Sequence, residues 1–130
     1  MFLLDTDTVI FNLKGNANVQ KNLSQHLNDS VSISVITLMA LYYGARKSQK
    51  IAANLAKIKM LEQSIEIIPI GVESTEIFGI LKAQLELAGN RLDDFDLLIA
   101  SCAISHNLTL VTNNIKHFQR IEGLKLVNWA

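Results

Sequence analysis

The chain has 130 residues, of which 49% are apolar and 18% charged, and its formal net charge is zero. This composition predicts one folded domain over residues 1–130 and argues against disorder. It also argues against a general, charge-driven nucleic-acid binder, while leaving a local basic face open. No apolar run approaches the roughly 18–20 residues that span a bilayer. We expect no membrane span, no signal peptide and, with Cys102 as the single cysteine, a cytoplasmic location.

Strand-like and helix-like segments alternate through the first half of the chain. Residues 2–4 read as a strand, followed by helices over 8–13 and 18–27. Residues 32–35 read as a second strand, followed by helices over 36–46 and 50–63. Ser34 is placed to cap the first of these two helices.

The alternation continues through the second half. A strand over 65–68 precedes a helix over 73–88, which Gly89 ends. The helix predicted over 94–106 is apolar nearly all round and is therefore expected to be buried. Short strands over 108–111 and 125–127 complete the chain. The pattern predicts an α/β domain with a central, mostly parallel sheet.

Polar residues stand where several of these elements begin or end. Asp5 follows the first strand, Asp96 lies at the start of the buried helix, and Thr112–Asn114 follow the late strand. Ligands of open parallel sheets bind beyond the carboxyl ends of the strands, so these side chains can converge on one cleft. Carboxylates without a Cys or His partner suit a hard divalent cation such as Mg²⁺.

Four segments of the chain carry a resemblance to a known family. They are residues 3–7, 34–45, 95–100 and 111–118, and their order and spacing resemble PIN-domain proteins, specifically the VapC toxins of bacterial toxin–antitoxin pairs. The resemblance implies a PIN-like three-layer α/β/α domain and a metal-dependent endoribonuclease that holds one or two Mg²⁺ or Mn²⁺ ions.

The same resemblance implies roles for individual residues. Asp5 and Asp96 match the carboxylates that bind the metal and take part in catalysis. Thr112 and either Asn113 or Asn114 match the secondary catalytic groups, and we favour Asn114.

The resemblance also implies partners. They are an RNA substrate, in particular tRNA and by closest resemblance the anticodon loop of initiator tRNA, a second copy of the chain in a homodimer, and a VapB-type antitoxin in a heteromeric complex. We expect the antitoxin to pack mainly against the helices over 36–46 and 50–63, with Leu41, Tyr42 and Tyr43 as anchors.

Position 40 departs from the family pattern. The second acidic residue of the family is a Glu at this place, whereas this chain has Ala40 between intact neighbours. We interpret Ala40 as an engineered Glu→Ala substitution that inactivates the enzyme, with a natural inactive variant as the alternative. Either origin removes one anionic group from the catalytic site, which should weaken metal binding and cleavage.

Most of these polar residues also have a purely structural interpretation. Asp5 can cap the first helix. Asp93 and Asp94 can stabilise the N-terminus of the buried helix, as Asp96 can through the helix dipole. Asp7 is expected to be an auxiliary or structural group beside the proposed metal site. Taken alone, residues 112–114 would form a turn.

Other residues offer weaker signals. His26, His106 and His117 lack ligand spacing, so zinc is not predicted, and His106 is expected at a helix end. Cys102 is expected to be an inert core thiol. The basic residues between positions 46 and 59 form either a solvated face or a rim that contacts phosphate.

Two further hypotheses compete with the enzyme. A catalytically silent module that sequesters antitoxin or RNA would have a natural Ala40, so a Glu codon in the source gene would argue against it. A phosphoacceptor receiver domain needs an Asp after a middle strand, and Ile68-Pro69-Ile70 supplies none.

Overall fold

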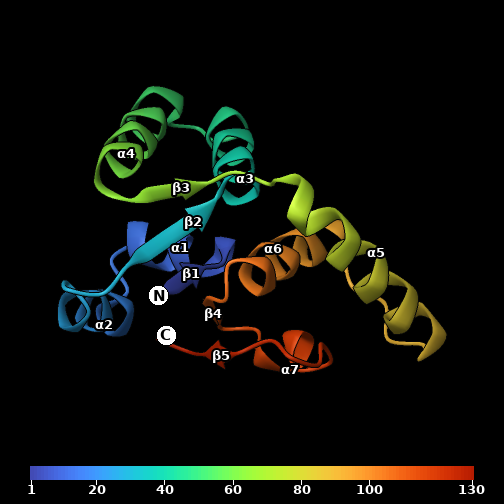
Figure 1. The fold of residues 1–130 in the computed structure, drawn as a ribbon. Coiled ribbons are helices and arrows are strands. Elements are labelled where there is room, and N and C mark those ends of the chain that lie inside the picture. The colour runs from blue at the N-terminus through green and yellow to red at the C-terminus, as the bar shows by residue number, and fades with distance from the viewer.

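A single parallel sheet organises the molecule, which the computed structural model describes over all residues 1–130. Its five strands lie in the order β3-β2-β1-β4-β5 (Figure 1). The strands are β1 (Phe2–Leu4), β2 (Val31–Ser34), β3 (Glu66–Ile68), β4 (Thr109–Val111) and β5 (Leu126–Val127). All neighbouring pairs are parallel.

Helices make every connection between these strands. They are α1 (Thr6–Leu13), α2 (Ala17–Gln25), α3 (Val35–Arg46), α4 (Ile51–Ser64), α5 (Val72–Leu87), α6 (Asp94–Ser105) and α7 (Ile115–Phe118). None of these helices combines the length and apolar character needed to cross a membrane.

The strand order reverses at the centre of the sheet. From β1 the chain builds outward through β2 to β3, then returns to the other side of β1 to add β4 and β5. The helix that follows β1 and the helix that follows β4 therefore come from different parts of the chain. In open α/β sheets such a switch point leaves a crevice at the carboxyl ends of the strands.

Two hydrophobic cores cover the two faces of the sheet. Leu3 and Leu110 belong to one core, which contains residues of α5, α6 and α7. Their sequence neighbours Leu4 and Val111 belong to the other, which contains residues of α1, α2, α3 and α4. Successive strand residues face opposite ways, so the central strands β1 and β4 are apolar at both of these positions. The three-layer α/β/α prediction is confirmed.

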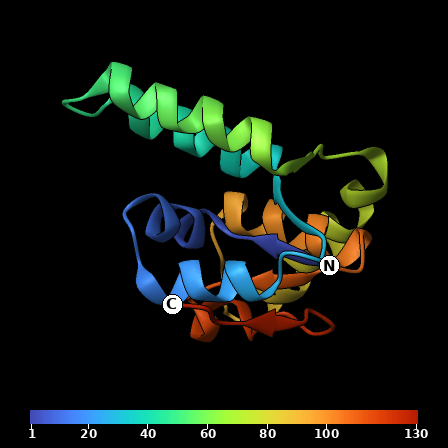
Figure 2. The same ribbon diagram turned by 90° about the vertical axis from the view of Figure 1, so that its left-hand side faces the viewer.

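Helices α3 and α4 form a hairpin that extends along one side of the molecule (Figure 2). Ser34 caps α3 as predicted, because its hydroxyl accepts a hydrogen bond from the Thr37 amide at 3.2 Å. The predicted apolar stripe of α4 is buried at Ile58 but is 39% exposed at Ile51.

The predicted element boundaries agree with the structure within two residues. Gly89 follows α5 with a φ of 73°, a conformation that glycine adopts without steric cost. The α5 stripe is correct at Leu81 and Leu85 but wrong at Ala88, which lies at the C-cap and is exposed. Helix α5 ends at Leu87, so Ala88 no longer lies on the helix face that packs against the core.

The C-terminus is fixed by an aromatic cluster. The Trp129 ring stacks on His26 at 4.8 Å between ring centroids and lies 5.0 Å from Phe2. Trp129 is 3% exposed although it is the penultimate residue. It therefore joins the tail to β1 and to the end of α2.

We predict that Trp129→Ala lowers the free energy of unfolding by about 3–5 kcal/mol, the usual cost of truncating a buried aromatic side chain. Urea denaturation followed by circular dichroism measures this change. Leu87→Ala is the control, because Leu87 is 90% exposed and should change stability little. Equal effects of the two substitutions would contradict the anchoring role of Trp129.

Candidate active site

Asp5 is the first residue after β1 and the N-cap of α1. Its side chain accepts a hydrogen bond from the Thr8 amide at 2.8 Å, and its own amide donates to the Val111 carbonyl at 3.0 Å. Asp5 is 5% exposed. The structural interpretation of Asp5 as a cap is therefore correct, and the cap fixes its carboxylate at the carboxyl end of β1.

Asp96 comes from the opposite side of the crevice, in the first turn of α6. About a third of its side chain is exposed. Its Oδ2 lies 3.4 Å from Nε2 of His117 in α7. Asp93 occupies the N-cap position without a side-chain cap bond, and Asp94 pairs with Lys82 at 3.0 Å.

Thr112 and Asn114 follow β4 beside Asp5. Thr112 is fully buried, and its hydroxyl oxygen accepts a hydrogen bond from the Asn114 amide at 2.9 Å. The Thr112 side chain also lowers the pKa of the neighbouring Asp5 carboxyl group. Thr112 thus shapes the turn and stabilises the Asp5 carboxylate without lining the crevice, whereas Asn114 lines it.

The predicted residues converge on a small cavity of about 60 Å³ at the carboxyl ends of β1 and β4. It is lined by Asp5, Thr6, Asp7, Asp96, Asn114 and Phe118, and we call it the acidic pocket. Asn113 and Ala40 are not among its lining residues. The expectation that residues of distant segments share one cleft therefore holds for Asp5, Asp96 and Asn114.

Burial makes the acidic pocket unfavourable for negative charge. Desolvation raises the pKa of Asp5, opposed by hydrogen bonds from Thr112 and Thr8. Desolvation also raises the pKa of Asp96; the charge of His117 opposes this rise, and the nearby Asp93, Asp5 and Asp7 add to it. A cation in the pocket would relieve these costs.

The donor set fits a hard cation that retains much of its water. The pocket offers the carboxylates of Asp5, Asp7 and Asp96 and the amide of Asn114. No group of three or more His, Cys, Asp or Glu side chains is arranged to hold a metal ion. Mg²⁺ is commonly bound through one or two carboxylates and several waters, so Asp5 and Asp96 suit it.

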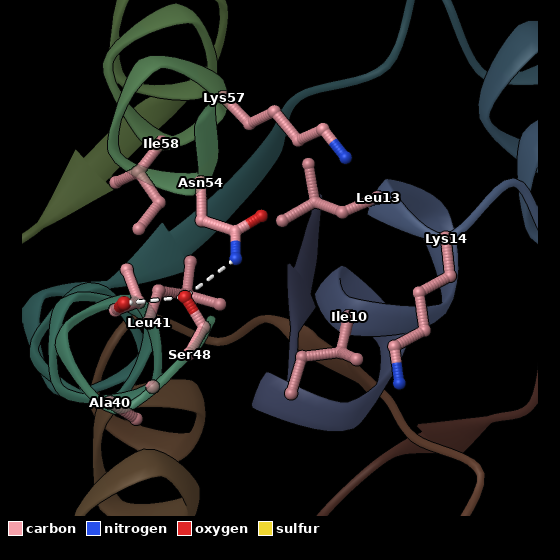
Figure 3. A pocket seen from close by; sticks show the side chains of 11 residues that line it. Ile10, Leu13, Lys14, Ala40, Leu41, Ser48, Asn54, Lys57 and Ile58 are labelled. Carbon is pink, nitrogen blue, oxygen red and sulfur yellow. Dashed lines mark hydrogen bonds between the residues drawn. The ribbon is translucent and has the colours of Figure 1, made fainter. Parts of the chain in front are cut away.

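Ala40 lies on the wall of a neighbouring and larger cavity of about 390 Å³ (Figure 3). We call this cavity the helix groove. Ile10 and Leu13 of α1 and its C-cap residue Lys14 face α3 and α4 across it. Ala40 is nevertheless one turn along α3 from Thr37, whose hydroxyl lies 3.1 Å from that of the pocket residue Thr6. Position 40 therefore borders the helix groove and lies one helical turn from a residue that contacts the lining of the acidic pocket.

The wall of the helix groove opposite α1 combines apolar and polar side chains. Leu41 and Ile58 supply apolar surface, and Asn54 donates a hydrogen bond to the Ser48 hydroxyl at 2.9 Å. Lys14 and Lys57 extend from opposite sides (Figure 3). Tyr42 and Tyr43 do not line this groove: Tyr42 hydrogen-bonds Glu62, and Tyr43 is 65% exposed.

The remaining nucleophile of interest is inert. Cys102 is fully buried in α6, and desolvation raises the pKa of its thiol to about 11. It is therefore protonated at neutral pH, although His106 lies 3.9 Å away. His106 occupies the C-cap of α6 as predicted.

Thr6 and Phe118 line the acidic pocket, and His117 contacts its residue Asp96; sequence reasoning assigned none of the three to the site. The contact of His117 with Asp96 joins α7 to α6, which are distant in the sequence. No spacing rule links them, and the single hint was the position of His117 within the matched segment 111–118.

Comparison with known proteins gives one consistent result. The PIN domain family model matches residues 2–124. Ribonuclease VapC2 of Rickettsia felis is 39% identical over 99% of this chain and 98% of its own. The tRNA(fMet)-specific endonuclease VapC of Salmonella typhimurium is 35% identical over the same shares. The crystal structure of Rickettsia felis VapBC2 bound to a promoter DNA fragment contains a chain that superposes with a TM-score of 0.95 at 38% identity, covering 99% of this chain and 98% of that one.

The raised pKa values predict a pH dependence of stability. A carboxyl group whose pKa is higher in the folded state stabilises the fold below its unfolded pKa near 3.8, and this stabilisation is lost as the pH rises through the folded pKa. At pH 7, ionised Asp96 should therefore cost stability. We expect Asp96→Asn to unfold at a higher temperature than the unmodified chain at pH 7 in EDTA, with the difference shrinking below pH 4.

Thermal unfolding of both proteins between pH 3.5 and 7.5 measures this effect. Asp94→Asn is the matched control, since Asp94 is more exposed and pairs with Lys82. A stability difference for Asp96→Asn that does not change with pH would contradict the desolvation argument.

Proposed function

The chain belongs to the VapC family of PIN-domain proteins, and we propose that the parent form of this chain is a metal-dependent endoribonuclease toxin. The observation that supports this proposal most directly is the acidic pocket, in which Asp5 and Asp96 meet at the switch point of the sheet. The names of relatives as ribonucleases and tRNA endonucleases agree with it.

Each pocket residue has a defined part in the proposed reaction. Asp5 and Asp96 would hold Mg²⁺ or Mn²⁺, and Thr112 keeps Asp5 in place. Asn114 offers an amide at the edge of the pocket, and buried Phe118 closes one side to water. A divalent ion bound there supplies charge that stabilises the phosphate and acidifies an attacking water.

The chain as it stands is proposed to be inactive or strongly impaired, because Ala40 replaces a carboxylate. Position 40 lies one helical turn from Thr37, which contacts the pocket residue Thr6. A longer acidic side chain there could reach the acidic pocket, whereas the alanine methyl group cannot bind a cation.

We predict that Ala40→Glu restores Mg²⁺- or Mn²⁺-dependent RNA cleavage, since it supplies the missing carboxylate. Cleavage of a tRNA pool by the purified chain and by Ala40→Glu, each with and without EDTA, measures this. Ala40→Gln is the matched control because it has nearly the same size without the charge. Asp5→Asn in the Ala40→Glu background should remove the restored activity while keeping the helix cap.

Equal cleavage by the unmodified chain, Ala40→Gln and Ala40→Glu would exclude position 40 from the catalytic site. If Ala40→Glu remains inactive, the alternative function is favoured. That alternative is a catalytically silent module that binds antitoxin or RNA, and Ala40 at the place of the family's acidic residue is the observation that favours it.

The proposed substrate is tRNA, with the anticodon loop of initiator tRNA as the first candidate. Two relatives, at 35% and 37% identity, are named tRNA(fMet)-specific endonucleases. Because the chain has no net positive charge, we expect recognition through RNA shape and unpaired bases more than through general charge.

The proposed partner is a VapB-type antitoxin, and the helix groove is its proposed binding surface. Similar solved structures are VapBC complexes. The groove combines apolar side chains such as Leu13 and Leu41 with two lysines, so it suits an apolar segment that carries an acidic residue. We also propose that the chain forms a homodimer within this complex.

We predict that Leu13→Ser weakens binding of the cognate antitoxin by roughly tenfold or more, because it removes an apolar anchor from the groove. Titration calorimetry measures the Kd. Tyr43→Ser is the control and should change the Kd little, since Tyr43 lies outside the groove. If Tyr43→Ser instead weakened binding more than Leu13→Ser, the antitoxin would bind the exposed face of α3 and not the helix groove. Ala40→Glu should bind within about tenfold of the unmodified chain, because no apolar anchor changes.

A further inference from the structure

The two principal carboxylates of the acidic pocket are held in different ways. Asp5 accepts a hydrogen bond from the Thr8 amide at 2.8 Å, and the neighbouring Thr112 side chain lowers the pKa of its carboxyl group. Asp96 has no hydrogen bond from the backbone or from a hydroxyl, and its one side-chain partner is His117, at 3.4 Å from Nε2 to Oδ2. The orientation of Asp96 thus depends on a single contact.

The packing of α7 fixes the position of the His117 ring. The next residue, Phe118, is 1% exposed and anchors the helix in the core beside α6. The two rings meet edge to face, with centroids 6.1 Å apart at 85°. The His117 amide donates to the Asn114 carbonyl at 3.1 Å, which joins the backbone of His117 to the turn after β4. His117 is therefore a fixed support rather than a mobile surface side chain.

A carboxylate in the first turn of a helix, partly exposed to water, would otherwise sample several rotamers. A contact at one oxygen selects a single rotamer and leaves the second oxygen free to bind a ligand. Supports of this kind commonly tune a metal site without touching the metal. The contact also leaves Oδ1 of Asp96 without any partner.

We propose that His117 is a positioning residue that holds Oδ2 of Asp96, so that Oδ1 is presented to a divalent cation in the acidic pocket. This inference rests on the proposed metal-dependent function. His117 would act through Asp96 and would contact neither the metal nor the RNA.

The first test needs no metal. Three-bond couplings of the Asp96 β-protons, measured by NMR in the unmodified chain in EDTA, report how many rotamers the side chain adopts. We expect one dominant rotamer in the unmodified chain and averaged couplings in His117→Ala. His106→Ala is the matched control, because His106 pairs with Glu73 at 3.9 Å at the other end of α6. Unchanged couplings in His117→Ala would overturn the proposal.

The second test measures the Mn²⁺ dissociation constant by calorimetry, without RNA, in the Ala40→Glu background. We expect His117→Ala to weaken Mn²⁺ binding by roughly 10–100-fold, the usual effect of removing an outer-shell partner. His117→Gln, which keeps an N–H group near the position of Nε2, should recover much of this loss, and His106→Ala should show none.

The outcomes separate this proposal from the proposed function. Unchanged Mn²⁺ affinity with reduced cleavage would overturn the positioning role, because His117 would then act on the RNA. If the Asp96 couplings average as expected while Ala40→Glu neither binds Mn²⁺ nor cleaves RNA, the proposed function fails and the support of Asp96 by His117 stands.

Discussion

The parallel pairing of β1 with β4 is the constraint on which the site depends. The register places Leu4 opposite Val111, so the next residues, Asp5 and Thr112, emerge side by side. The Val111 carbonyl accepts hydrogen bonds from the Asp5 amide and the Thr8 hydroxyl, each at 3.0 Å. The start of α1 is thus joined directly to the end of β4. A change in this register would separate Asp5 from the group that stabilises its charge.

Electrostatics explains why so small a pocket contains several carboxylates. Burial raises the pKa of Asp5 and Asp96, and their mutual repulsion adds to the cost. Both residues lie at helix N-termini, where the helix dipole favours negative charge. The fold therefore keeps the carboxylates ionisable without neutralising them. Such a site gains most from a cation, whether a metal ion or a basic side chain from a partner.

The sequence was sufficient to predict the fold and the strand-end residues, but not the contacts between elements. Strand and helix periodicity located every element except the short helix α7, and the switch-point rule brought Asp5, Asp96 and Asn114 together. The pairing of His117 with Asp96 depends on how α7 packs against α6, which no local pattern contains. The same holds for position 40: the family motif predicts its chemistry, whereas only the packing of α1 against the α3–α4 hairpin shows that it also borders a groove.

The side chain at position 40 affects the acidic pocket and the helix groove in different ways. On one side, Thr37 and Thr6 link its helix to the acidic pocket through a 3.1 Å contact. On the other side, its methyl group forms part of the wall of the helix groove. A carboxylate there would add charge to a pocket that already resists it, so its cost would be recovered only when a cation is bound. Alanine removes that cost and keeps the groove wall apolar. A substitution at this position can therefore change the local charge while retaining the fold and the shape of the groove.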